Sequence, residues 1–240
     1  GQDPNRRQLL ARLEGPSAEH WLGTDDLGRD VFIRVLYAGR VSLLVGVLAA
    51  LTAFVIGVTA GLLAGYYQRW VDDAINAIIQ TTVNIPLLFL LILLSVVFRP
   101  GVVGLAFILG LLSWQGNARQ IRAAVLSVKQ RDYVEAGRVV GATDRRLMWR
   151  HILPNVTSIV LVVTGFDVAG AILAESGLSA LGLGIQPPTA SWGNMLSKSF
   201  QYTTKAPWLV ISPGVMIFLT VFSIFLIADG IRDALDPRIS

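Results

Sequence analysis

The sequence contains no cysteine, which excludes disulfides and thiolate metal sites and leaves the redox compartment open. It has only two histidines, His20 and His151, and no carboxylate or histidine stands at metal-ligand spacing from either. We therefore expect no metal site. A phosphate-binding loop of the G-x-x-x-x-G-K-[ST] type is missing as well, because the sequence contains no Gly-Lys pair. The chain should accordingly bind no nucleotide through that motif.

Charge is scarce and unevenly distributed. Only 15% of the 240 residues are charged, against roughly 25% in soluble domains, and the mean hydropathy is +0.60. A helix needs about 20 apolar residues to cross a bilayer core of about 30 Å. Four stretches of this length, or nearly so, contain no charged side chain: 41–68, 74–98, 100–118 and 206–228. This pattern excludes an ordinary soluble domain and predicts an all-α transmembrane fold.

The apolar stretches predict five membrane spans in this chain, over about 41–67, 74–98, 102–114, 155–178 and 208–228. Gly57, Gly61 and Gly65 share one face of the first span, a spacing that lets another helix approach closely. Pro86 falls inside the second span and predicts either a kink or the start of the helix proper at that point.

The placement of Lys and Arg predicts the orientation. The polar loop 115–154 is basic and is expected in the cytoplasm; its cations are Arg119, Arg122, Lys129, Arg131, Arg138, Arg145, Arg146 and Arg150. Counting spans then puts the tail 230–240 inside and the segment 1–38 outside. That leading segment is itself rich in Arg, so we expect a further helix upstream of Gly1, giving six spans in the full subunit. A five-span protein of opposite topology is the alternative.

The segment 131–155, RDYVEAGRVVGATDRRLMWRHILPN, predicts two short amphipathic helices with a break between them. Gly141 suits the left-handed position that ends the first helix, and Thr143 or Asp144 suits the cap of the second. Leu153-Pro154 is expected to close that second helix before the next span. Such an elbow either docks into a groove of another protein or lies on lipid headgroups, and the residues alone leave both readings open.

The order Glu135-Ala136-Gly137, then Gly141, then Leu153-Pro154 resembles the EAA loop of permeases in ATP-binding-cassette importers. Two positions depart from that pattern, because Gly137 replaces an alanine and His151 stands where an isoleucine is usual. Two further stretches, at 20–40 and 174–196, are similar to C-type permeases of dipeptide, oligopeptide or nickel importers. The resemblance covers nearly the whole chain.

This resemblance implies the bundle of a type I importer permease over 39–229 and movement of di- or oligopeptides across the membrane. It implies that the chain is not itself an enzyme and binds no cofactor, with ATP and Mg on two separate ATPase subunits. The other implied partners are a homologous B-type permease, an extracytoplasmic solute-binding protein and membrane lipid, but no nucleic acid. The location would be a bacterial or archaeal cytoplasmic membrane, with several passes. The implied ATPase-coupling residues are Glu135, Ala136, Gly137, Arg138, Gly141, Asp144, Leu153 and Pro154.

The stretch 179–207 is rich in Gly, Pro and Ser, too irregular for a lipid-facing helix. We expect the solute-binding protein to contact this stretch and the segment 20–38. Trp192, Tyr202 and Trp208 are expected to be anchors at the membrane interface rather than ligand contacts.

Two acids in the fourth span, Asp167 and Glu175, are candidates for the translocation pathway, because intramembrane carboxylates are costly and face a cavity or a partner. For Asp167 the alternatives are a pathway-lining and a helix-pairing role. For Glu175 the competing interpretation is a carboxylate that meets water at the extracellular end of its helix. The two acids also define a second functional class, an ion-coupled secondary transporter with both as its proton relay. The lack of an obvious inverted repeat argues against that class.

Overall fold

The computed structural model describes the backbone of residues 3–235, with the side chains of that range except at 157–159 and 235. Within this part the chain is helical, and its only extended pairing is an isolated bridge between Thr24 and Asp30. The helices are α1 (Val31–Tyr67), α2 (Arg69–Val83), α3 (Leu87–Phe98), α4 (Val102–Leu111), α5 (Trp114–Lys129), α6 (Asp132–Val139), α7 (Asp144–Arg146), α8 (Leu153–Ala180), α9 (Trp192–Ser199) and α10 (Trp208–Leu235).

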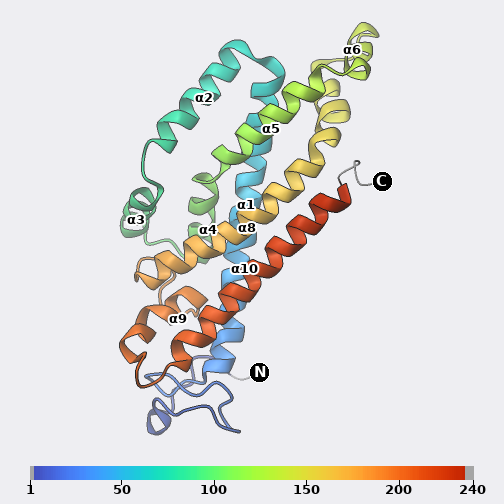
Figure 1. Cartoon of the computed structure of the whole chain (residues 1–240). Helices are drawn as coiled ribbons and strands as arrows, with labels where there is room; N and C mark the ends of the chain where they lie inside the picture. Colours follow the sequence, from blue (N-terminus) through green and yellow to red (C-terminus); the bar gives the residue numbers. More distant parts are fainter. Residues whose placement is uncertain (1–2, 236–240) are drawn as a thin grey trace.

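Helix α1 runs along the whole length of the molecule (Figure 1). It begins at Val31, well before the predicted start of the first span at 41, because Asp30 caps it: the Asp30 carboxylate accepts a hydrogen bond from the Ile33 N–H at 3.0 Å. With 37 residues the helix is about 55 Å long, more than a bilayer core requires. Part of α1 therefore lies within the segment 1–38 that the sequence assigned to the outside.

The glycine stripe of α1 is where α5 packs. A Cβ added at Gly57 would lie 2.6 Å from the Asn117 Cβ, and one added at Gly61 would lie 2.6 Å from the Ala118 carbonyl oxygen. Gly65 meets α5 in the same way. No side chain fits at these three positions, so the close approach of two helices predicted from the glycine spacing is confirmed.

Among the described residues, three helices are long and apolar enough to cross a membrane by length and composition: α1, the Val160–Ala180 part of α8, and the Trp208–Ala234 part of α10. Helices α2 and α3 reach that standard only together, and they are bent by 79° at the break that contains Pro86. The predicted kink is thus confirmed, and α2 and α3 together form either a broken span or a re-entrant loop. Helix α4 is apolar but shorter than a span.

The polar loop 115–154 is not a loop throughout, which corrects the sequence-based boundary. Its first part is helix α5, which packs on α1 and α8. Ala118, Ile121 and Val125 of α5 are buried, whereas Arg119 is exposed. The half-buried Arg122 and Lys129 reach polar groups of α2 and α1. The count of charges along the sequence therefore did not reveal that this polar stretch contains a helix of the bundle.

The two ends of the molecule carry different elements (Figure 1). Helix α6 lies at one end, α9 and the segment before α1 lie at the other, and α10 ends on the side of α6 but short of it. The membrane sidedness of 115–154 and 1–38 stays a prediction. Which end faces the cytoplasm stays a prediction from the positive charges.

Trp192 is a buried packing residue and not an interfacial anchor, which corrects the expectation from its type. Its side chain is 2% exposed, and its indole N–H donates to the Val35 carbonyl oxygen at 3.0 Å. Gly39 of α1 makes room for the ring, because a Cβ there would lie 2.8 Å from it. Trp192 thereby fixes α9 against α1.

We predict that Gly61→Ala lowers the free energy of unfolding by about 1–3 kcal/mol, because the added methyl overpacks the contact with α5. The midpoint of thermal unfolding of the purified transporter complex measures this effect. Gly116→Ala is the matched control, since Gly116 lies on the open side of α5 with no atom within 4 Å of an added Cβ. Equal midpoints for the two variants would contradict the packing assignment.

Candidate functional site

The segment 131–155 forms the helical elbow that the sequence predicts. Helix α6 is followed by Gly141, whose φ of +83° is the left-handed conformation expected at the end of the first helix. The second arm begins at Asp144, and the Thr143 hydroxyl accepts a hydrogen bond from the Arg146 N–H at 3.4 Å. Thr143 is therefore the cap, and Asp144 is free for another contact.

Leu153-Pro154 does not end the second arm, which corrects the sequence-based expectation. The π-helical turn η2 (Leu147–Ile152) runs directly into α8, with the Leu153 N–H donating to the Met148 carbonyl oxygen. Pro154 has no N–H to donate, and its ring would clash with the preceding turn of a regular helix. The wider π-turn relieves this conflict, so the elbow is continuous with the span that follows.

Apolar packing holds the two arms together and against the bundle. Val134 of α6 and Leu147 of the second arm are both fully buried in one cluster with Leu62 of α1 and Val125 of α5. Gly137 gives the space for this contact, because a Cβ there would lie 3.0 Å from the Leu147 Cδ2. The small residue at the third EAA position thus lets α6 pack closely against Leu147.

A polar contact fixes the elbow to the ends of α1 and α5. The Tyr66 hydroxyl donates to the Asp144 Oδ1 at 2.6 Å, and the Lys129 Nζ donates to the Tyr66 carbonyl oxygen at 2.5 Å. Burial lowers the pKa of Lys129, Arg138 lowers it further, and Asp144 opposes the shift. Sequence reasoning placed Asp144 in the coupling loop but missed Tyr66, because nothing local connects residues so far apart in the chain.

The outer tip of the elbow is exposed and partly apolar. Val139 and Val140 are 81% and 83% exposed. Nearby, Glu135 and Arg138 form an exposed ion pair with 3.3 Å between Oε2 and NH1, and Ala136 is exposed as well. Of the predicted coupling residues, Glu135, Ala136 and Arg138 thus lie on one projecting surface that offers apolar contacts and a pair of charges, whereas Gly137 and Asp144 face the bundle and Leu153-Pro154 belongs to α8.

Asp167 lies between α8 and α5, half-buried, where the Asn117 amide donates to its Oδ2. Asn117 also packs against Gly57 of α1. The hydrogen bond between Asn117 and Asp167 therefore links α8 to the close contact between α1 and α5. Of the two roles that the sequence left open for Asp167, these contacts support helix pairing.

Glu175 is fully buried, with 0% exposure, so the alternative in which it meets water at the end of its helix is wrong, while its place in the translocation pathway stays a prediction. The Ser42 hydroxyl donates to one carboxylate oxygen at 3.1 Å, and the Ser179 hydroxyl donates to the other at 2.7 Å. Each serine oxygen in turn accepts a backbone N–H, from Trp192 at 3.2 Å and from Ile185 at 3.0 Å. The carboxylate therefore joins α1, α8 and the start of α9.

The two acids do not form one site. Asp167 is bound to α5, Glu175 to serines of α1 and α8, and no contact connects them within the described residues. No cation pairs with either in that part of the chain. Nor does any group of three or more His, Asp or Glu side chains there have the arrangement of a metal site.

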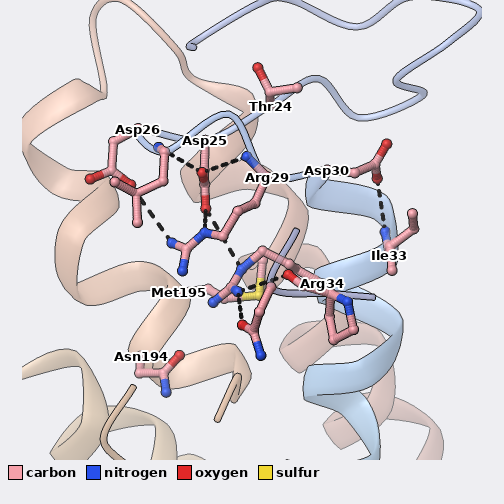
Figure 2. Close-up of polar contacts among 12 residues, drawn as sticks. Thr24, Asp25, Asp26, Arg29, Asp30, Ile33, Arg34, Asn194 and Met195 are labelled. Atoms are coloured by element: carbon pink, nitrogen blue, oxygen red, sulfur yellow. Dashed lines mark hydrogen bonds and ion pairs between the residues drawn. The ribbon is translucent and has the colours of Figure 1, made fainter. Parts of the chain in front are cut away.

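The motif at 20–40 folds into a polar network beside α9 (Figure 2). The Asp25 carboxylate binds the Arg29 Nε at 2.6 Å and lies 3.7 Å from the Arg34 Nε. Arg34 is buried and also donates to the Pro4 carbonyl oxygen at 3.1 Å. Met195 of α9 lies next to these side chains (Figure 2). The network holds the polar leading segment in a fixed shape on the bundle.

The fold defined by these helices is that of the membrane-spanning permease subunit of an ATP-binding-cassette importer. A structure of the MetNI methionine transporter in an inward-facing conformation superposes with a TM-score of 0.68 at 18% identity, over 85% of this chain and 97% of that one. At this identity the match shows the fold alone.

Sequence comparisons identify the family. The model described as "Binding-protein-dependent transport system inner membrane component" matches residues 57–240, and the chain belongs to this family. The chain is therefore a multi-pass protein of the bacterial cytoplasmic membrane.

Three relatives illustrate how far the similarity extends. The dipeptide transport system permease protein DppC of Alkalihalophilus pseudofirmus is 40% identical over 95% of this chain and 75% of its own length. DppC of Bacillus subtilis is 41% identical over 98% and 73%. The glutathione transport system permease protein GsiD of Pectobacterium atrosepticum is 40% identical over 94% and 75%.

We predict that Glu175→Ala destabilises the protein by about 2–4 kcal/mol, because two buried hydroxyls lose their acceptor. Glu175→Gln should retain most of the stability, since an amide can bind both serines. Thermal unfolding of the purified complex measures this, with Glu19→Ala as an exposed control. Uptake by the Gln variant decides the proton-relay alternative, because an amide cannot release and take up a proton as a carboxylate does. Loss of uptake with normal stability would favour the proton relay over a purely structural role in joining α1, α8 and α9.

Proposed function

We propose that this chain moves di- or oligopeptides across the cytoplasmic membrane as one permease of an importer driven by separate ATPase subunits. The observation that carries the coupling part of the proposal is the elbow, a projecting surface that is structurally continuous with α8. The complete complex would contain a homologous B-type permease, two ATPase subunits with ATP and Mg, and an extracytoplasmic solute-binding protein.

Force would enter at the exposed tip of the elbow. Val139 and Val140 offer apolar surface for a groove of the ATPase subunit, and Glu135 and Arg138 offer charge-assisted hydrogen bonds. Closure of the ATPases would then move the elbow. Because η2 joins α8 without a break, and Asp144 is bound to Tyr66, α8 and the α1–α5 pair would follow as one body.

At the opposite end, we propose that the polar segment before α1 and the region around α9 receive the solute-binding protein. The Asp25, Arg29 and Arg34 network and the buried Trp192 give these segments a fixed shape, which suits docking of a rigid partner. Substrate released there would enter the cavity between the two permeases while it is outward-facing. It would move inward when that cavity becomes inward-facing.

The substrate class follows from the relatives, whose names specify dipeptide and glutathione transport. Both substrates are short peptides, so we propose short peptides for this chain. Uptake by cells that express the full transporter, tested with labelled di- and oligopeptides and with nickel, should show competition among peptides. Transport of nickel but no peptide would contradict the substrate class.

The coupling proposal predicts that Val140→Asp reduces both ATP-driven uptake and the association of the ATPase subunits by roughly tenfold or more, because an unpaired charge buried at an interface costs several kcal/mol. Reconstituted proteoliposomes and pull-down of the ATPases measure the two effects. Leu10→Asp is the control for association of the ATPase subunits alone, since Leu10 is an exposed apolar residue at the other end of the molecule, in the segment proposed for the solute-binding protein. Normal uptake by the Val140 variant would contradict the docking surface. Uptake that follows a proton gradient and ignores ATP depletion would favour the ion-coupled alternative.

A further inference from the structure

The second arm of the elbow has a basic outer face distinct from the coupling tip. Leu147 and Met148 of this arm are buried against the bundle. The two positions before this pair and the two after it are exposed, and they form two pairs spaced by four residues. These positions are Arg145, Arg146, Trp149 and Arg150. Together with Thr143 they surround an open hollow of about 540 Å³.

The three guanidinium groups of this face have no acidic partner. Every ion pair in the described part of the chain involves other residues, and no hydrogen bond there uses a side-chain nitrogen of these arginines. Each guanidinium carries five N–H donors and a charge that is never lost. Three like charges within six positions of one helix repel one another, so the face is complementary to a bound anion.

The position of the face in the fold indicates which anion. Arg150 stands ten residues, about 15 Å along a helix, before the candidate span of α8 that begins at Val160, so we place this arm near the membrane surface. Trp149, 53% exposed, stands among the arginines, and tryptophan is enriched at the level of the lipid headgroups. Planar guanidiniums bind phosphate oxygens in a bidentate manner.

We propose that Arg145, Arg146 and Arg150, with Trp149, form a binding site for the phosphate group of anionic lipid headgroups in the cytoplasmic leaflet. The proposal relies on the predicted orientation of the elbow and goes beyond the coupling role proposed above. A bound headgroup offsets part of the positive charge of the arginines and holds the second arm at the membrane surface, while the apolar tip at Val139 and Val140 stays available to the ATPase subunit.

Native mass spectrometry of the purified complex tests this directly, with phosphatidylglycerol or phosphatidylcholine added to the detergent. Wild-type complex should retain phosphatidylglycerol in preference to phosphatidylcholine. The triple variant Arg145→Gln, Arg146→Gln, Arg150→Gln should bind phosphatidylglycerol up to roughly a hundredfold more weakly, since each Arg near an anionic surface contributes about a fivefold factor. Each single variant should show a part of this loss, which keeps the test open if the triple variant assembles poorly.

The matched control has the same charge change at the other end of the molecule: Arg6→Gln, Arg7→Gln, Arg12→Gln, all exposed positions. It should retain wild-type lipid occupancy. Unchanged phosphatidylglycerol binding by the elbow variants would overturn the proposal. So would displacement of the lipid by an equal concentration of inorganic phosphate, which would identify a free phosphate as the ligand. Loss of the ATPase subunits from the triple variant in phosphatidylcholine nanodiscs, where wild type keeps them, would assign the face to protein docking instead.

Discussion

The close contact between α1 and α5 is the constraint on which the rest of the structure depends. Three glycines on one face of α1 let the two backbones approach to a distance that no side chain would permit. Van der Waals packing of this kind is the main attraction between helices in lipid, where apolar surface gains little from leaving the solvent. The other faces of α5 then become available to fix the remaining helices.

From this pair, polar contacts extend to the neighbouring helices. Asn117 of α5 binds Asp167 of α8, and Arg122 of α5 binds Asp72 of α2, with 2.6 Å between Arg122 Nε and Asp72 Oδ1. At one end of α8 the elbow is attached through Tyr66 and Asp144, and near its other end Glu175 joins the serines that fix α9. Helix α8 thus connects the surface proposed for the ATPase with the surface proposed for the solute-binding protein.

Local patterns predicted much of this architecture. Charge-free stretches predicted the apolar helices, the glycine spacing predicted the tight contact, and Gly141 and Pro86 marked a helix end and a bend. Each of these signals acts within a few residues, which is why a single sequence reveals it.

What could not be predicted depends on contacts between distant segments. Helix α5 was not predicted because a count of charged residues along the sequence does not show that its apolar residues share one buried face. The surroundings of Glu175 stayed open because the residues that cover it, around Trp192, come later in the chain. The continuity of the elbow with α8 was missed since a π-turn accommodates Pro154 where a regular helix would break.

The central claim is that the elbow, α8 and the α1–α5 pair move as one body when the ATPases close. Spin labels on Ser127→Cys of α5 and Asn155→Cys of α8 test it most directly, and the chain contributes no cysteine of its own. Pulsed electron resonance would compare nucleotide-free and ATP-trapped transporter, with other subunits free of cysteine. The account predicts an unchanged distance within this chain, while the distance from Ser127→Cys to a label on the partner permease shifts. An equally large shift within the chain would contradict it.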